Sequence, residues 1–357
     1  MTPRADSQTD RPVTLATVAE AVGVSRMTVS NAYNRPDQLS PAMRDKVLAA
    51  AAALGYSGPN PVARTLSRGE TGSIGLVLDY ALTQAFSDPA TIGFLHGVAA
   101  GCEERAVGLS LVPKIAGRDA ALVQSALVDG FILYCTPEGD PRHTAVLDRR
   151  LPYVLVDYDP GSGPRTVNID DRGASRRMAE HLLALGHRSF GLALPWSKPD
   201  TAGQAQAAAF RNVDAQRLAG WRDALEAAGI DWDPIPVGTA PGDRRATGRD
   251  AASTLLDRAD RPTAILSLSD SVALGIIDAA RARGIAVPAQ LSVAGFDDIP
   301  TAATSDPPLT TVRQPHELKG AEAVRLLLEA DGPSAVQLPT QLVVRASTGP
   351  LTERSTR

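Results

Sequence analysis

Apolar residues follow two patterns along this chain, and the first pattern occupies its N-terminal part. Thr14 can cap a helix that Gly23 is expected to end. Between them, apolar residues recur at the i, i+3, i+4, i+7 spacing of one helical face: Leu15, Val18, Ala19 and Val22. This spacing predicts a short helix with one buried face.

A second helix is predicted from Ser25 to Asn34. Ser25 can cap it, and Val24 with Val29 can form a hydrophobic staple that sets the angle of the turn. Val29 and Tyr33 face the first helix. The opposite stripe is hydrogen-bonding and almost uncharged: Met27, Ser30, Asn31 and Asn34. Such a stripe is unusual for a plain solvated surface and suits the base edges of a major groove.

Ser40 and Pro41 mark the start of a third helix, which is expected to bury Val47, Ala51 and Leu54 and to end at Gly55. Three short helices with a glycine turn between the first two predict a helix-turn-helix. Residues 11–69 carry seven basic and three acidic residues, while the whole chain has a net charge of −4. A basic segment attached to an acidic remainder of the chain is typical of a domain that contacts DNA phosphates. A structural three-helix bundle remains an alternative.

The second pattern begins at Ser73, where continuous apolar runs alternate with helical segments. The predicted strands are SIGLVLD, GLSLVPK, GFILYC, PYVLVD, SFGLAL, IPVG, TAILSL and LSVAGFD. Helices are expected near residues 92–106, 120–127, 172–185, 217–228, after 243, and at 270–283. This alternation predicts two doubly wound parallel-sheet subdomains facing each other across a cleft. The chain is expected to cross between them near residues 157–168, 296–300 and 310–314.

Composition narrows the functional classes. Of 357 residues, 43% are hydrophobic and 21% charged, and no apolar run reaches the roughly 20 residues of a membrane helix. The N-terminus lacks the apolar segment of a signal peptide, so we expect a cytoplasmic, nucleoid-associated protein. Cys102 and Cys135 are expected to be core residues. No catalytic or metal-binding motif is present, so neither enzymatic activity nor a cofactor is expected. An α/β enzyme and a free solute-binding protein are the alternatives.

The segment VTLATVAEAVGVSRMTVSNAYN, followed by LGYSGPNPVARTL, closely resembles the N-terminus of LacI/GalR-family repressors. Weaker similarity continues through HLLALGHRSFGLA, QRLAGWRDAL and PPLTTVRQP. The resemblance implies a helix-turn-helix headpiece joined to a domain similar to periplasmic sugar-binding proteins. It implies a disordered tail (1–11), a DNA-binding domain (12–58), a hinge helix and linker (59–72), and an effector-binding and dimerisation domain (73–350). The N-subdomain would comprise about 73–162 and 298–330, and the C-subdomain about 163–297 and 331–350.

The resemblance also implies which residues contact DNA. Arg26 and Met27 open the expected recognition helix, where the family varies most. Further phosphate and base contacts are expected from Thr14, Ser25, Thr28, Ser30, Asn31 and Asn34. The hinge helix of the family forms on the operator and wedges a leucine into the minor groove; the matching residues are Asn60, Ala63, Arg64 and Leu66. An ordinary polar linker is the alternative for this hinge.

For the effector, Arg217 and Asp270 match family positions that contact the ligand, and their side chains could hydrogen-bond a polyol. Further candidates lie at strand ends or in the following loops: Asp79, Tyr80, Phe86, Asp88, Thr91, Trp196 and Asp297. Residues 195–210 depart from the family pattern. We therefore expect a homodimeric repressor that binds a pseudo-palindromic operator and a small-molecule effector, with a sugar favoured, but the sequence does not identify that effector.

Overall fold

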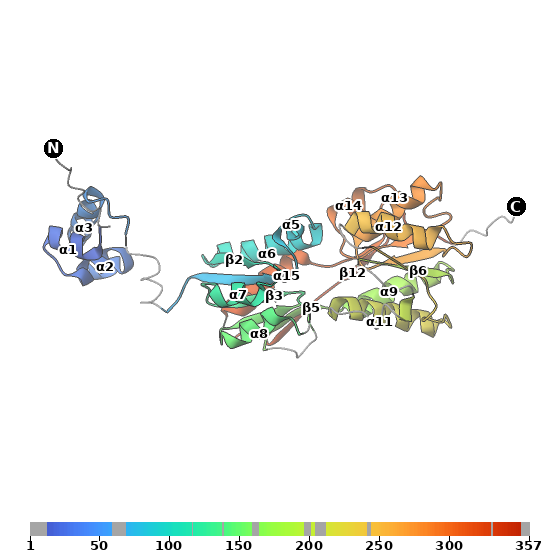
Figure 1. Cartoon of the computed structure of the whole chain (residues 1–357), viewed down its shortest axis with the longest axis horizontal. Coiled ribbons are helices and arrows are strands. Elements are labelled where there is room, and N and C mark those ends of the chain that lie inside the picture. The colour runs from blue at the N-terminus through green and yellow to red at the C-terminus, as the bar shows by residue number, and fades with distance from the viewer. Residues whose placement is uncertain are drawn as a thin grey trace, which may run out of the picture. The chain divides into compact units, whose positions relative to one another are not determined.

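The computed structural model describes residues 13–58, 69–115, 117–137, 139–158, 164–195, 201–203, 212–240, 244–329 and 331–350. Contacts divide the chain into two compact units, Met1–Thr71 and Gly72–Arg357. The first holds the predicted three-helix module and the second holds both α/β subdomains (Figure 1).

Three capped helices form the first unit: α1 (Leu15–Val22), α2 (Arg26–Asn34) and α3 (Pro41–Ala53), with a 3-10 turn at Pro36–Gln38. Thr14 and Thr17 form a reciprocal capping box on α1, and Gly23 ends this helix with a positive φ of 75°. Ser25 and Ser40 accept hydrogen bonds from the backbone at the starts of α2 and α3. These local hydrogen bonds explain why the helix starts could be predicted.

The core of this unit contains small aliphatic residues from all three helices: Val18, Ala19, Val22, Val29, Ala32, Val47 and Ala51. The prediction that Leu54 is buried is wrong, because this residue caps α3 and is 37% exposed. Tyr56 packs against the core instead, with its ring edge-on to Tyr33 at 6.0 Å.

The N-subdomain contains a six-stranded parallel sheet with the order β11-β5-β4-β3-β1-β2. Its strands are β1 (Ser73–Leu78), β2 (Gly108–Val112), β3 (Phe131–Tyr134), β4 (Tyr153–Val156), β5 (Thr166–Ile169) and β11 (Ala335–Leu338). Its helices are α5 (Leu82–Ala85), α6 (Pro89–Glu104), α7 (Asp119–Ser125), α8 (Pro141–Asp148) and α15 (His316–Leu328). Leu76 packs in the core that includes α6 and α15, whereas Val77 packs in the core that includes α7 and α8. Helices therefore cover both faces of the sheet (Figure 1).

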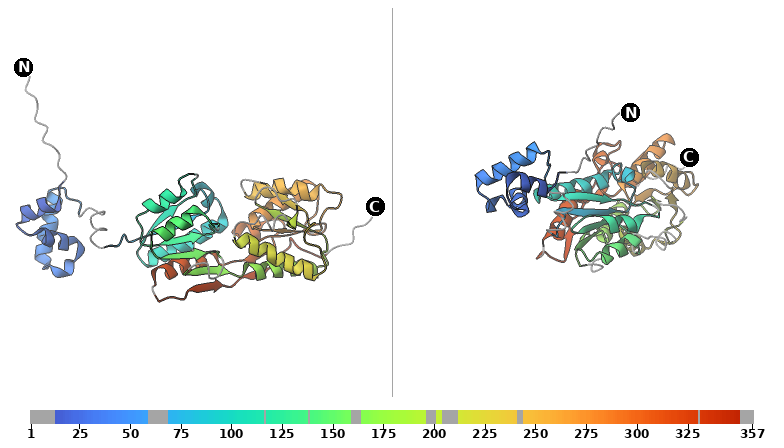
Figure 2. Two further views of the ribbon diagram at one scale, coloured as in Figure 1. Left: turned by 60° about the horizontal axis from the view of Figure 1, so that its bottom comes forward. Right: turned by 60° about the vertical axis from the view of Figure 1, so that its left-hand side comes forward.

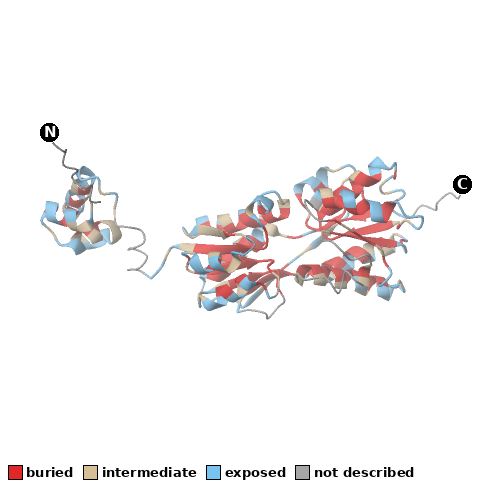
Figure 3. Cartoon of the chain, viewed as in Figure 1, coloured by how far each residue is buried: buried red, intermediate tan, exposed pale blue. Residues whose placement is uncertain are grey.

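The C-subdomain repeats this design with a four-stranded parallel sheet, β7-β6-β8-β9. Its strands are β6 (Phe190–Leu194), β7 (Val237–Thr239), β8 (Ala264–Ser267) and β9 (Ser292–Ala294). Helices α9 (Asp171–Ala184) and α11 (Asn212–Ala227) cover one face, and α12 (Arg244–Leu256) and α13 (Asp270–Ala282) cover the other. Figure 2 shows these layers from two further directions, and Figure 3 shows that strands β6, β7, β8 and β9 are almost wholly buried between them.

The crossing segments require a correction to the predicted subdomain boundaries. β5 pairs with β4 and β11 pairs with β5, so residues 166–169 and 335–338 belong to the N-terminal sheet. The sequence prediction assigned both segments to the C-subdomain, because these short strands have weak apolar patterns. Two further short strands, β10 (Thr311–Arg313) and β12 (Gln341–Val343), pair antiparallel beside the crossings, and α14 (Pro300–Thr304) precedes them.

Two of the compositional expectations can be compared with the described residues. Among them, no helix combines the length and apolar character needed to cross a membrane. Cys102 and Cys135 are both buried and carry free thiols. Their burial agrees with the interpretation of these cysteines as core residues.

Candidate functional site

The candidate DNA-binding surface is the exposed side of α2. Val29 and Ala32 bury the opposite side of this helix against α1 and α3. Met27 is 68% exposed, and Arg26 beside it is also exposed. The Ser25 hydroxyl lies 2.9 Å from that of Thr28 and accepts from the Thr28 backbone at 3.0 Å. The start of α2 is therefore held by local bonds while its first two side chains remain open to solvent.

The rest of the polar stripe is half-buried. Asn34 donates to the Ser30 hydroxyl at 3.2 Å, and Asn31 donates to the Gln38 side chain at 3.3 Å. These bonds hold the Asn34 amide against α2 and the Asn31 amide toward the turn at Pro36–Gln38. The predicted hinge residues Asn60, Ala63, Arg64 and Leu66 lie outside the described residues.

The candidate ligand site lies where the two sheets of the second unit face each other. In the order β2-β1-β3-β4, successive connections leave β1 in opposite directions, and this creates a crevice beyond the carboxyl ends of β1 and β3. The order β7-β6-β8-β9 creates the same crevice beyond β6 and β8. A cavity of about 40 Å³ is lined from the first crevice by Tyr80, Tyr134 and Cys135, and from the second by Pro195, Leu268 and Ser269.

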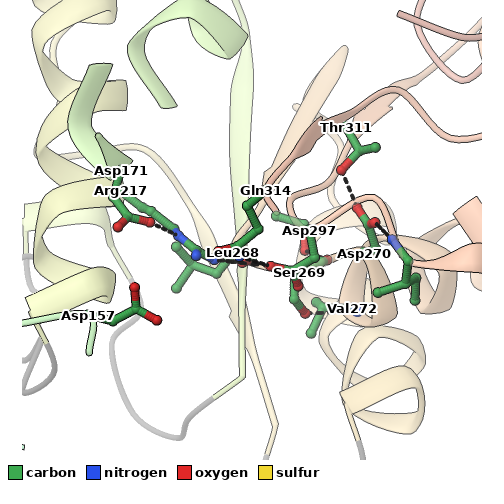
Figure 4. Close-up of polar contacts among 12 residues, drawn as sticks. Asp157, Asp171, Arg217, Leu268, Ser269, Asp270, Val272, Asp297, Thr311 and Gln314 are labelled. Carbon is green, nitrogen blue, oxygen red and sulfur yellow. Dashed lines mark hydrogen bonds and ion pairs between the residues drawn. The ribbon is translucent and has the colours of Figure 1, made fainter. Parts of the chain in front are cut away.

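Arg217 lines this cavity, and Figure 4 shows its polar contacts. It comes from the first part of α11 and donates to the Asp171 carboxylate at 2.8 Å and to the Leu268 carbonyl at 2.8 Å. A third partner, Asp297, lies 3.8 Å away, and the guanidinium stacks 3.7 Å from the centre of the Phe296 ring. Burial raises the pKa of Asp171 above its ordinary value. The guanidinium fork is therefore fixed by four partners from different parts of the chain.

A second set of buried polar groups continues from Asp297 into the N-subdomain. Gln314 donates to Asp297 at 2.7 Å, and its side-chain oxygen accepts from Lys319 at 2.7 Å. Lys319 also donates to Asp157 at 2.7 Å. Hydrogen bonds and ion pairs thus run from α11 through two crossing segments to α15. An ionised group this deep is tolerated only with such partners.

Backbone strain is concentrated in the same place. Six non-glycine residues of the described chain have positive φ angles: Ala106, Cys135, Arg150, Asp157, Asp297 and Asp298. Three of these, Cys135, Asp157 and Asp297, line the cavity. Positive φ is costly for L-residues and is often found at ligand sites, where the surrounding structure enforces it. The positive φ angles are therefore a second observation, separate from the side-chain contacts, that indicates a ligand site at this cavity.

The cavity includes several of the predicted effector residues. Tyr80, Asp88, Arg217 and Asp297 line it. Thr91 lies behind Asp88 and donates to it at 2.6 Å. Asp79 does not line the cavity and is paired with Lys114 and Arg142. Trp196 lies outside the described residues.

Two further predicted effector contacts, Phe86 and Asp270, do not line this cavity. Phe86 does not line the cavity and is 58% exposed. Asp270 is fully buried and accepts from the Ile299 backbone at 2.9 Å and from the Thr311 hydroxyl (Figure 4). Burial raises the pKa of Asp270 well above its ordinary value, and the neighbouring Asp297 carboxylate raises it further. In this structure Asp270 holds the crossing segments together and does not line the cavity.

The sequence prediction missed several lining residues. The cavity is also lined by Asp157, Asp214, Gln314 and His316. Lys319 does not line the cavity but donates to Asp157. Asp157 ends the apolar run PYVLVD, so its position at a strand end was a usable signal. Gln314, His316 and Lys319 offered none, because they end or follow a crossing segment whose fold depends on distant parts of the chain.

A second cavity, of about 250 Å³, lies on the other side of Asp171. Tyr158, Thr166 and Asn168 line it from the N-subdomain, and Asn212 and Gln216 line it from α11. Among the described residues, no group of three or more His, Cys, Asp or Glu side chains is arranged to hold a metal ion.

Comparison with known proteins bears on both candidate sites, the exposed surface of α2 and the cavity lined by Arg217. The model described as bacterial regulatory proteins, lacI family, matches residues 14–60, and a periplasmic binding protein-like domain matches residues 179–348. An HTH-type transcriptional regulator of Mycobacterium tuberculosis is 42% identical over 353 residues, which cover 95% of this chain and 98% of that relative. The chain belongs to the LacI family. It is therefore a DNA-binding transcription regulator with an effector-binding domain, and not an enzyme.

Solved LacI-family structures have the same fold. The lac repressor dimer bound to operator and an anti-inducer has a TM-score of 0.76 at 30% identity, covering 95% of this chain and 100% of that chain. A complex of the regulator CelR with cellobiose has a TM-score of 0.68 at 32% identity, covering 94% and 99%. The predicted helix-turn-helix and paired parallel sheets are thus confirmed.

Proposed function

We propose that this LacI-family protein is a cytoplasmic repressor that binds a pseudo-palindromic operator as a homodimer and releases it when a sugar or sugar derivative enters the cleft. The observation that carries the effector half of the proposal is the Arg217 constellation between the two facing crevices. A fixed donor surrounded by carboxylates matches the hydroxyl groups of a saccharide. The operator-bound lac repressor dimer and the CelR–cellobiose complex support both halves by similarity.

In the DNA-binding half of the proposal, α2 enters the major groove. Arg26 and Met27 select bases, and Thr28, Ser30, Asn31 and Asn34 add phosphate and base contacts, together with Thr14 and Ser25 at the helix starts. Asn31 can pair with adenine through two hydrogen bonds once it leaves Gln38. Two headpieces related by two-fold symmetry require half-sites repeated with the same symmetry.

The hinge couples the two halves of the proposed mechanism. In the proposed mechanism, the hinge helix predicted within residues 59–72 forms only on the operator, and Leu66 from each protomer wedges into the central base step. Ligand entry requires the subdomains to move apart, because a cavity of about 40 Å³ is far below the roughly 300 Å³ of a small-molecule site. A ligand that favours one spacing of the subdomains then shifts the population away from the DNA-bound state.

Selection of duplexes from a random library by the full-length protein tests the DNA-binding half. We expect enrichment of a two-fold symmetric site, and Asn31→Ala should relax selection at one base pair of each half-site. Enrichment of an asymmetric site, or of none, would contradict the dimer model.

Titration of saccharides onto the protein–operator complex tests the effector half. At least one saccharide should release the operator, and Arg217→Ala should abolish that release. Arg222→Ala is the matched control, because Arg222 lies on the same helix in an exposed pair with Glu226. Release that is unaffected by Arg217→Ala would place the effector elsewhere.

A further inference from the structure

His316 is the first residue of α15 and lines the cavity between the subdomains. Both of its ring nitrogens are shielded from solvent, and neither has a hydrogen-bond partner among the described residues. Leaving two buried polar atoms unpaired costs free energy, so such a group in a folded protein calls for an explanation. His316 lies on the cavity wall, where a molecule in the cavity could supply these partners.

Close helix packing fixes the start of α15 and with it His316. A Cβ atom added at Gly93 of α6 would lie 3.1 Å from the His316 Cβ, and one added at Gly97 would overlap the Glu317 carbonyl. The two glycines therefore let α6 approach the backbone of α15. The ring of His316 is built into a close-packed helix pair, and its placement does not depend on a loop.

The surroundings of His316 determine its charge. Burial and the nearby Lys319 ammonium lower the pKa of His316 to about 4. The ring is therefore neutral near pH 7 and carries one donor nitrogen and one acceptor nitrogen. A hydroxyl group can donate or accept, so a set of hydroxyl groups can satisfy both nitrogens. A carboxylate or a phosphate dianion can satisfy only the donor.

The charges around the cavity also disfavour an anionic ligand. Four carboxyl groups line it, from Asp88, Asp157, Asp214 and Asp297. Arg217 is bonded to Asp171, and the Lys319 ammonium behind the cavity is bonded to Asp157. An added anion would meet more negative than positive groups at short range, in a site with little water to screen them.

We propose that His316 binds the hydroxyl groups of the effector through both ring nitrogens and thereby selects an uncharged polyol or saccharide over its phosphorylated or acidic forms. This inference rests on the proposed function, because it assigns a residue and a ligand class to the same cleft. It goes further in excluding sugar phosphates and sugar acids as effectors.

The test uses matched ligands and full-length protein. Glucose, galactose, ribose, inositol and cellobiose are titrated by calorimetry, together with the phosphate ester of each monosaccharide and the hexuronates. We expect at least one uncharged parent to bind, and its anionic derivatives to bind at least tenfold more weakly. Tighter binding of an anionic form, or no binding by any uncharged parent, would overturn the ligand class.

Three variants test the role of His316. His316→Phe keeps a ring but removes both nitrogens, and it should weaken binding of the uncharged parent at least tenfold. His316→Gln restores a donor and an acceptor and should recover part of that loss. His96→Phe is the matched control, because His96 is an exposed histidine of the adjacent helix α6. Unchanged binding by His316→Phe would overturn the assignment.

Operator affinity without ligand separates this inference from the proposed function. His316→Phe should bind the operator as the wild type does, since the headpiece is a separate unit. If an uncharged parent binds through His316 but does not change operator affinity, the proposed ligand control fails and the His316 assignment stands.

Discussion

The headpiece and the cleft both hold polar functional groups, but they hold them in opposite ways. On α2, Arg26 and Met27 are exposed, and each is positioned by the helix that carries it. In the cleft, Arg217 and Lys319 are buried, and each is positioned by partners far away in sequence. Polar groups that meet DNA can remain hydrated until they bind, whereas groups that enclose a small ligand must be dehydrated beforehand.

Because of this difference, a substitution in the headpiece can change DNA binding without changing stability. A substitution in the cleft is expected to change ligand binding and stability together. Removing an exposed side chain from α2 takes away a contact to DNA and little else. Removing one member of the cleft network leaves its partners buried without compensation, so folding suffers along with the ligand response. Four substitutions test this contrast, and their expected effects on the free energy of unfolding decrease in the order given.

Arg217→Ala should have the largest effect. It leaves the Asp171 carboxylate buried without its cation, and the expected loss is about 3–5 kcal/mol. Urea denaturation measures this loss. Arg222→Ala, which breaks only an exposed pair on the same helix, should change stability by less than about 0.5 kcal/mol. Similar losses in the two variants would show that the buried pair of Arg217 contributes no more to the free energy of unfolding than an exposed pair does.

A pH series on His316→Phe should show the next largest effect. In the wild type the folded pKa of His316, about 4, lies below its ordinary value of 6.5, so the unfolded chain binds more protons between these pH values. Stability therefore falls as pH decreases through 6.5 and levels off below about 4, a cost of about 2 kcal/mol at pH 5. The pKa values of His181 and His187 are also lowered by burial, so the variant should lose only part of this dependence. An unchanged profile would contradict a neutral, buried His316.

Ser25→Ala should cost about 1 kcal/mol, because it removes the cap of α2. Ser40→Ala removes the equivalent cap of α3 and should cost a similar amount. Only Ser25→Ala is expected to weaken operator binding beyond its effect on folding, since α2 carries the proposed base contacts. Equal losses of operator affinity, measured by fluorescence anisotropy, would argue against α2 as the recognition helix.

Met27→Ala should have the smallest effect on stability, less than about 0.5 kcal/mol, because the side chain is 68% exposed. Its effect on DNA should be larger, with altered base preference near the centre of each half-site. Denaturation and competition binding with mutated operators measure the two effects separately. A loss of stability without any change in base preference would contradict the prediction that Met27 acts in DNA binding and not in folding.

The headpiece could be predicted almost completely because its determinants are local. Thr14, Ser25 and Ser40 each bond to a backbone group three residues ahead, and Gly23 ends α1. The error at Leu54 arose because helical spacing continued one residue beyond α3, while tertiary packing gave that place to Tyr56.

The cleft was predicted only in part. Strand ends supplied Tyr80 and Asp297, and the family resemblance supplied Arg217. The resemblance also suggested Asp270, which the structure buries beneath the crossing segments, away from the cavity. Lys319 looks like an ordinary polar helix residue in the sequence, yet it is buried against Asp157.

The sequence by itself determined the helix starts and ends of the headpiece, the alternation of strands and helices, and the family, because each is encoded in short-range patterns. Only the tertiary structure decided which polar side chains surround the cavity, which sheet receives β5 and β11, and which charges neutralise one another. Several of these depend on contacts between segments far apart in the sequence, such as that between Asp157 and Lys319. Local propensity carries no information about such pairs, since they form only when the two sheets and their crossing segments have packed.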